Sequence, residues 1–256
     1  MIQLRPLRRR TLAFLTASAA SLPFCTALFL LSCNPRLANG LRAHDLHRDV
    51  AIITTKGTIV VRLSDSTPLH RDNFLHLAKT NFYDSLLFHR VIHNFMIQSG
   101  DPDSREGHPG KPLSQGGKGG PGYTIAAEFR PSLFHKKGAL AAARTNDDVN
   151  PAKASSGSQF YIVQGKKFTP AGLDSLETGR LKGRKIPAEY RAAYTSIGGT
   201  PHLDQNYTVF GEVVKGLDVV DSIAATPTSG PPLDRPIHEV RILKMKLIRR
   251  IQYNEK

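Results

Sequence analysis

Residues 88–101 read FHRVIHNFMIQSGD, a mostly apolar stretch in which Arg90 is the only permanently charged residue before the closing Asp101. If the stretch is extended, Arg90, Met96 and Gln98 lie on one face, because side chains separated by an even number of residues point the same way in a strand. Burying a guanidinium without a partner is costly, so Arg90 requires either a structural carboxylate or a ligand carbonyl. The residues themselves leave both alternatives open.

The flanking sequence indicates a mainly β protein. Alternating apolar residues over 50–55 and a second run over 58–63, joined by Lys56-Gly57, predict a hairpin. Further strands are expected over 87–98, 123–129, 139–143, 159–163, 208–213 and 240–248. Many short strands with a few helices are typical of a β-barrel or sandwich capped by helices.

Two helices are predicted among these strands. Thr67 is a helix-capping residue type and Pro68 suits the first helical position, so a helix is expected to begin there. Its expected apolar face consists of Leu69, Phe74, Leu77 and Ala78. A second helix is expected over 217–224. A charged, helical segment over 170–195 falls between two strands and is expected to be an insertion.

Other kinds of site fail on spacing. The 10 histidines include neither an H-E-x-x-H motif nor a Cys/His cluster, which argues against zinc. The Gly-rich run over 116–122 is followed by a predicted strand and not a helix, so it is expected to be a turn and not a phosphate-binding loop. Ser158 lacks the second glycine of a nucleophile elbow.

The N-terminal residues have the features of an export signal. A basic cluster over 5–10 precedes an uncharged, mostly apolar run over 11–31. The run ends in Leu-Leu-Ser-Cys at 30–33, which resembles the lipobox of bacterial lipoproteins, where cleavage precedes the cysteine and its thiol carries diacylglycerol. The alternative is an uncleaved membrane helix, since about 20 apolar residues can span a bilayer.

We therefore expect a signal peptide over 1–32, lipidation at Cys33, a polar tether over 33–48 and a domain over 49–256. This organisation predicts a membrane-anchored lipoprotein of the cell envelope, facing the periplasm or the cell exterior.

Charge and cysteine content narrow the partners. The chain has 35 Lys+Arg against 21 Asp+Glu, a formal net charge of +14, and only 2 cysteines, which excludes a disulfide scaffold. The basic residues are scattered, and export separates the protein from nucleic acid. An anionic membrane surface therefore explains the charge better than a nucleic-acid partner, which we do not expect.

Read as a whole, the stretch 88–101 resembles the F-H-R-V-I-x-x-F-M-I-Q-x-G-D signature of the cyclophilins, which are peptidyl-prolyl cis-trans isomerases. Further similar segments follow in order: 119–129 (G-G-x-G-Y…E-F), 138–144 (G-x-L-x-M-A-[NR]), 156–162 (N-G-S-Q-F-[FY]-I) and 203–214 (L-D-x-x-x-x-V-F-G-x-V). The resemblance covers about 49–248. It implies a mainly β fold: an eight-stranded antiparallel barrel capped by two helices, here with a helical insertion over about 167–200.

The resemblance also implies roles for individual residues. Arg90 and Gln98 match catalytic positions. Substrate-binding positions are matched by Phe95, Met96, Ala143, Arg144, Gln159, Tyr161, Leu203 and Tyr207. The family acts on Pro-containing polypeptides without a cofactor or metal, so the chain is expected to assist the folding of exported proteins, as a monomer. The alternative is a proline-binding module or holdase chaperone with little catalysis.

Some residues depart from the family pattern. Tyr207 replaces the usual pocket histidine, and His202 stands where many eukaryotic members have a tryptophan associated with cyclosporin binding. The segments over 102–115 and 167–200 are longer than the usual connections and are expected to border the substrate groove.

Overall fold

The computed structural model describes residues 40–105 and 119–250 of the chain. The predicted signal peptide, the lipidation at Cys33 and the tether up to residue 39 lie outside the described residues, as does most of the long loop over 102–115. No helix in the described ranges is long and apolar enough to cross a bilayer.

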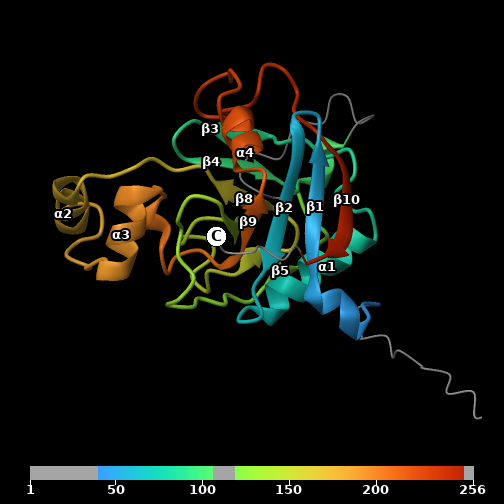
Figure 1. The fold of residues 1–256 in the computed structure, drawn as a ribbon, viewed down its shortest axis with the longest axis horizontal. Coiled ribbons are helices and arrows are strands. Elements are labelled where there is room, and N and C mark those ends of the chain that lie inside the picture. Colours follow the sequence, from blue (N-terminus) through green and yellow to red (C-terminus); the bar gives the residue numbers. More distant parts are fainter. Residues whose placement is uncertain (1–39, 106–118, 251–256) are drawn as a thin grey trace, which may run out of the picture. The chain divides into compact units, whose positions relative to one another are not determined.

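The fold is built on an 8-stranded antiparallel sheet with the strand order β10-β1-β2-β9-β6-β8-β4-β3 (Figure 1). Its strands are β1 (Arg48–Thr54), β2 (Gly57–Leu63), β3 (Arg90–Ile92), β4 (Met96–Ser99), β6 (Ala139–Ala142), β8 (Phe160–Val163), β9 (Val209–Lys215) and β10 (Ile242–Arg249). A bridge between Leu87 and Arg241 joins the two edges, supported by a 2.9 Å bond from Phe88 N to Val240 O. The prediction of an eight-stranded antiparallel fold is confirmed, as a sheet curled until its edges meet.

Helices account for most of the remaining regular structure. They are α1 (Pro68–Lys79), α2 (Pro170–Thr178), α3 (Ala188–Ser196) and α4 (Leu217–Ala224), with short 3₁₀ turns at Ala43–His47, Pro102–Ser104 and Pro201–Leu203. Figure 1 shows α1 and α4 at opposite ends of the sheet, and α2 and α3 to one side of it. The two predicted capping helices and the helical insertion are therefore present.

Strands β6 and β8 bury both of their faces, which explains their continuous apolar character. In β8, Phe160 and Ile162 belong to the interior core, together with most of the apolar side chains of α1 and α4. Tyr161 and Val163, the alternating residues, belong to a second apolar cluster on the outer face of the same strands. Because successive side chains in a strand point to opposite faces, one four-residue strand serves the core and an external site at once.

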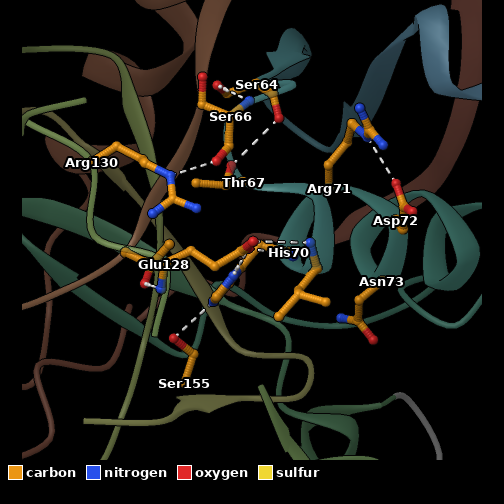
Figure 2. Close-up of polar contacts among 12 residues, drawn as sticks. Ser64, Ser66, Thr67, His70, Arg71, Asp72, Asn73, Glu128, Arg130 and Ser155 are labelled. Carbon is orange, nitrogen blue, oxygen red and sulfur yellow. Dashed lines mark hydrogen bonds and ion pairs between the residues drawn. The ribbon is translucent and has the colours of Figure 1, made fainter. Parts of the chain in front are cut away.

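The N-terminus of α1 is capped by a side chain that is distant in sequence (Figure 2). Thr67 occupies the N-cap position, but its side chain makes no capping hydrogen bond. The Glu128 carboxylate instead accepts the backbone N–H of Leu69 (3.2 Å) and of His70 (3.0 Å). It thus satisfies two of the N–H groups that a helix N-terminus leaves without intrahelical partners.

The predicted apolar face of α1 is wrong at Leu69, which is 53% exposed, while the polar His70 is buried. His70 Nδ1 lies 2.7 Å from Glu128 Oε2, and Nε2 lies 2.9 Å from Ser155 Oγ. These contacts give both ring nitrogens a hydrogen-bond partner, which offsets the cost of burying the imidazole. They also explain why only Thr124–Ile125 (β5) of the predicted strand over 123–129 forms a ladder, with Ser155–Ser156 (β7): the chain then turns to bring Glu128 to α1.

The packed domain begins before Asp49. The polar character and missing periodicity of residues 41–48 predict a tether, but Leu41 is fully buried in the interior core. Asp45 in the 3₁₀ turn accepts hydrogen bonds from Arg42 N (2.8 Å) and from Lys79 Nζ of α1 (2.6 Å). Leu41, the partly buried Leu46 and a few polar contacts thus attach a segment whose sequence carries no periodic signal.

Candidate active site

The segment over 88–101 forms a hairpin and not the single strand predicted over 87–98. Asn94 adopts a left-handed φ of 60° and reverses the chain between β3 and β4. In this register Arg90 lies opposite Gln98, and Ile92 lies opposite Met96. Directly opposed residues of an antiparallel pair project to the same side, so the expected grouping of Arg90, Met96 and Gln98 holds through cross-strand pairing.

The apolar part of the site is the cluster on the outer face of the sheet. Met96 and Tyr161 are buried in it, on the neighbouring strands β4 and β8. The other predicted pocket residues that pack against them, partly buried, are Phe95, Ala143, Leu203 and Tyr207. We call this set the pocket cluster. It assembles residues spread from 95 to 207 into one apolar surface.

A pair of glutamines forms the polar part of the site. Gln98 Nε2 donates to Gln159 Oε1 at 3.0 Å, and Gln159 Nε2 donates to the backbone oxygen of Gly119 at 3.0 Å. Gln159 Nε2 also lies 3.3 Å from Asp101 Oδ2. Buried Gln159 is therefore held on its amide nitrogen side, and this fixes the orientation of the partly buried Gln98 beside Arg90.

Arg90 is only weakly engaged by the protein. Its side chain is 40% exposed, and Nε lies 3.6 Å from Asp234 Oδ2, which is an ion pair beyond hydrogen-bonding distance. Among the described residues the guanidinium makes no hydrogen bond. Of the two partners considered for Arg90, a structural carboxylate or a ligand carbonyl, the carboxylate is thus present. It lies on the Nε side and leaves donors on the guanidinium for a ligand.

Arg144, in contrast to Arg90, has a buried side chain that bonds other residues of the protein. Its side chain is 4% exposed, Nη1 pairs with Asp147 Oδ1 at 2.6 Å, and Nε donates to Asn206 O at 2.8 Å. The guanidinium carbon lies 4.5 Å from the centre of the Tyr207 ring, and that ring meets Tyr161 edge to face at 6.1 Å. Arg144 therefore holds Tyr207 against the pocket cluster, a cation–π arrangement that fixes the aromatic replacing the usual histidine.

Two histidines near the site are kept neutral by burial. Burial lowers the pKa of His89 to about 4, with Asp101 opposing the shift and Arg90 adding to it. Burial, with a smaller contribution from Arg180, lowers the pKa of His202 to about 4 as well. His202 stacks on Phe95 at 5.7 Å between ring centres. At neutral pH the pocket cluster therefore has an uncharged aromatic neighbour at the position where a tryptophan is common.

A buried polar chain behind the pocket cluster was not anticipated from the sequence. Asp204 Oδ1 lies 2.9 Å from His135 Nδ1, and His135 Nε2 lies 3.0 Å from the Tyr161 hydroxyl. Tyr194 donates its hydroxyl to Asp204 Oδ2 at 2.6 Å. Asp204 lies in the segment over 203–214 that resembles the family motif, whereas no spacing pattern indicates His135 or Tyr194. Within the described ranges, no group of three or more His, Cys, Asp and Glu residues could hold a metal ion.

Comparisons with known proteins agree with this arrangement. Residues 50–247 match the family model described as cyclophilin type peptidyl-prolyl cis-trans isomerase/CLD. A Staphylococcus saprophyticus protein with the provisional name peptidyl-prolyl cis-trans isomerase is 34% identical over 196 residues, covering 76% of this chain and 89% of that protein. A Staphylococcus aureus protein with the same provisional name is 36% identical over 194 residues, covering 75% and 88%.

Solved structures share the fold. A cyclophilin type peptidyl-prolyl cis-trans isomerase from Cryptosporidium parvum superposes with a TM-score of 0.55 at 24% identity, covering 78% of this chain and 97% of that one. A crystal structure of the same protein in the presence of the dipeptide Ala-Pro gives a TM-score of 0.53 at 24% identity, covering 78% and 98%.

Proposed function

Because the chain belongs to the cyclophilin-type peptidyl-prolyl cis-trans isomerase family, we propose that Arg90 and the pocket cluster together catalyse rotation about X-Pro bonds in exported polypeptides. The isomerase activity is that of the family. The roles of the individual residues and the exported substrates are the proposal.

The chemistry follows from the electronic structure of the amide. Rotation about an X-Pro bond breaks amide resonance and faces a barrier of roughly 18–20 kcal/mol. In the twisted state the prolyl nitrogen becomes pyramidal and regains a lone pair, which can accept a hydrogen bond. Arg90 donates to that nitrogen and also holds the proline carbonyl, so its interaction grows as resonance is lost. An interaction stronger in the transition state than in the ground state accelerates the reaction.

The observation that carries this proposal is the position of Arg90. Its guanidinium has one 3.6 Å ion pair, and Arg90 lies directly opposite Gln98 in the β3–β4 ladder. Met96 in β4 connects this ladder with the pocket cluster. The apolar cluster provides the surface for the proline ring and excludes water, which strengthens a hydrogen bond made beside it. No covalent bond changes, so the residues present suffice for the reaction.

Catalysis is tested by exchange NMR on an Ala-Ala-Pro-Phe peptide with the full chain. We expect the protein to accelerate cis–trans exchange and to shift the peptide resonances on binding. Phe95→Ala should weaken peptide binding because it removes an aromatic wall of the pocket cluster. Binding without accelerated exchange would instead support the proline-binding module or holdase, and would contradict the catalytic role of Arg90.

The cellular context rests on the N-terminal sequence. A basic cluster, an apolar run and Cys33 at its end support an export signal with a lipid anchor at the membrane. The substrates would then be exported polypeptides near that membrane, met by a monomeric enzyme of the cell envelope. Intact-mass measurement of the membrane-extracted protein should give an N-terminus at lipid-modified Cys33, and Cys33→Ala should leave the precursor mass. A mature N-terminus elsewhere would contradict the anchor.

A further inference from the structure

The helical insertion has an apolar core of its own. Leu173 of α2 and Tyr190 and Tyr194 of α3 are buried together with Ile186 from the connection between the helices. Glu177 ties the connection together: it accepts from Lys185 Nζ (2.8 Å), Ile186 N (3.0 Å) and Arg191 Nη1 (2.8 Å). These contacts, led by Lys185, lower the pKa of Glu177 to about 2. The segment therefore has a packed core and a connection held by hydrogen bonds and ion pairs.

This small core reaches the barrel through one side chain in particular. Tyr194 is fully buried, and its hydroxyl donates to Asp204 Oδ2 at 2.6 Å, the shortest contact in the polar chain behind the pocket cluster. Asp204 also accepts the backbone N–H of His135 at 2.8 Å. The insertion thus contributes a hydrogen bond to a carboxylate that the barrel alone would satisfy only in part.

A series of hydrogen-bonding contacts runs from Tyr194 through Asp204 and His135 to Tyr161. A carboxylate is an acceptor only, so His135 Nδ1, 2.9 Å from Asp204 Oδ1, must carry a proton. His135 Nε2 lies 3.0 Å from the Tyr161 hydroxyl, which completes the series of contacts. The three contacts link α3 to a pocket wall through groups that are all at least nine-tenths buried. Hydrogen bonds that reach charged groups in such surroundings are stronger than average and fix geometry.

The Tyr161 hydroxyl is not needed for an apolar wall. Here the ring packs in the pocket cluster while the hydroxyl bonds His135, and the two rings stack at 6.1 Å. The position of the wall is therefore coupled to Asp204 and, through it, to α3.

We propose that Tyr194 is a positioning residue of the proline pocket, through which the α2–α3 segment sets the position of Tyr161 by way of Asp204 and His135. The inference deepens the proposed function and rests on it. It assigns the insertion a part in substrate affinity, although the insertion supplies none of the residues that match the family motifs. We call the series Tyr194–Asp204–His135–Tyr161 the relay. Because the Tyr161 wall of the pocket binds the proline ring equally in the ground and transition states, the relay should act on KM and leave kcat largely unchanged.

The test removes one hydroxyl at a time. Tyr194→Phe keeps the ring in the insertion core but breaks the bond to Asp204, and should raise KM for Ala-Ala-Pro-Phe by about threefold to tenfold, with kcat within about twofold. Tyr190→Phe is the matched control: it lies on the same helix and stacks on Phe134 at 4.0 Å, but its hydroxyl has no hydrogen-bond partner among the described residues. It should leave both constants unchanged.

A spectroscopic readout and a double-mutant cycle make the test specific. In ¹⁵N-histidine-labelled protein, His135 should show the Nδ1–H tautomer, and its ring nitrogen shifts should move in Tyr194→Phe and not in Tyr190→Phe. Tyr161→Phe cuts the relay at its other end, so adding Tyr194→Phe to that variant should raise KM less than it does in wild type.

Several outcomes would overturn the inference: an unchanged KM in Tyr194→Phe, an equal rise in Tyr190→Phe, or fully additive effects with Tyr161→Phe. An unfolded Tyr194→Phe protein would overturn it as well, because the hydroxyl would then serve global stability. Failure of the proposed function is distinguishable. If wild type does not accelerate exchange, the peptide dissociation constant and the His135 shifts still report whether the relay positions the pocket wall.

Discussion

Replacing Arg90 with alanine should lower catalytic activity without lowering stability, because the guanidinium contributes little to holding the fold together. The side chain is 40% exposed and its ion pair with Asp234 spans 3.6 Å. Exposed pairs of this kind contribute about 0–1 kcal/mol to the free energy of unfolding. A preorganised donor to a developing lone pair is worth more: its loss typically costs a factor of about 10²–10³, or roughly 2.7–4 kcal/mol.

We therefore expect Arg90→Ala to lower kcat/KM for an X-Pro peptide by about 10²–10³ while the urea unfolding midpoint barely changes. Arg90→Lys should recover only part of the activity, since an ammonium lacks the planar fork of donors. Asp234→Asn removes the carboxylate and retains the guanidinium, so most of the activity should persist.

Arg235→Ala is the matched control for loss of one positive charge. Its side chain is 41% exposed and its ion pair with Glu239 spans 3.9 Å, close to the values for Arg90. It should keep near-wild-type activity. A folded Arg90→Ala protein with activity within about fivefold of wild type would refute the reasoning, and an equal loss in Arg235→Ala would show that general positive charge, and not a directed donor, is what matters.

Further predictions concern pH, the insertion and inhibitor binding. Burial lowers the pKa of His89 and of His202 to about 4, against the ordinary value of 6.5 in the unfolded chain, so the folded state binds fewer protons between pH 6.5 and 4. The free energy of unfolding should therefore fall on acidification from pH 6.5 to 4, by on the order of 3 kcal/mol for His89 alone. A free energy of unfolding, measured in urea, that stays constant over this pH range would contradict the prediction. Replacing residues 171–198 with a short Gly/Ser linker should leave the barrel folded, as judged by circular dichroism, because the interior core does not include the insertion. The replacement should raise KM at least as much as Tyr194→Phe does. An unfolded product would show that the segment is essential to the fold. Cyclosporin should bind the protein poorly, and His202→Trp should lower its dissociation constant as measured by calorimetry. An indole offers more ring area and a different donor than the imidazole that stacks on Phe95. Tight cyclosporin binding by the unmodified protein would contradict this prediction.

Much of the fold could be predicted because its signals are local. Alternating apolar residues, the Thr67-Pro68 helix start and the turn at Lys56-Gly57 each act over a few residues, and the corresponding strands and helices formed. The pocket residues Phe95 and Met96 and the candidate catalytic pair Arg90 and Gln98 lie in one continuous motif, so a single stretch of sequence indicated them. Their proximity in the structure follows largely from that adjacency, with one tight turn added at Asn94.

The parts that could not be predicted depend on contacts between distant residues. The Glu128 carboxylate caps α1 across 58 residues, and His135 meets Asp204 across 69 residues. No spacing rule connects such positions, because the packing of separate segments, and not the local chain, brings them together. The same residue type also has opposite outcomes: His70 and His135 are buried with carboxylate partners, while His93 and His238 are exposed.

The local sequence was enough to predict a mainly β fold, and the motif over 88–101 was enough to indicate the family. Three features emerged only from the packed structure: Leu41 belongs to the core, Arg90 keeps donors free beside a carboxylate 3.6 Å away, and Tyr194 of the insertion bonds Asp204. The physical reason is the range of the interactions. Strand periodicity is fixed by backbone geometry within a few residues, whereas the burial and pairing of a polar group depend on every segment that packs around it.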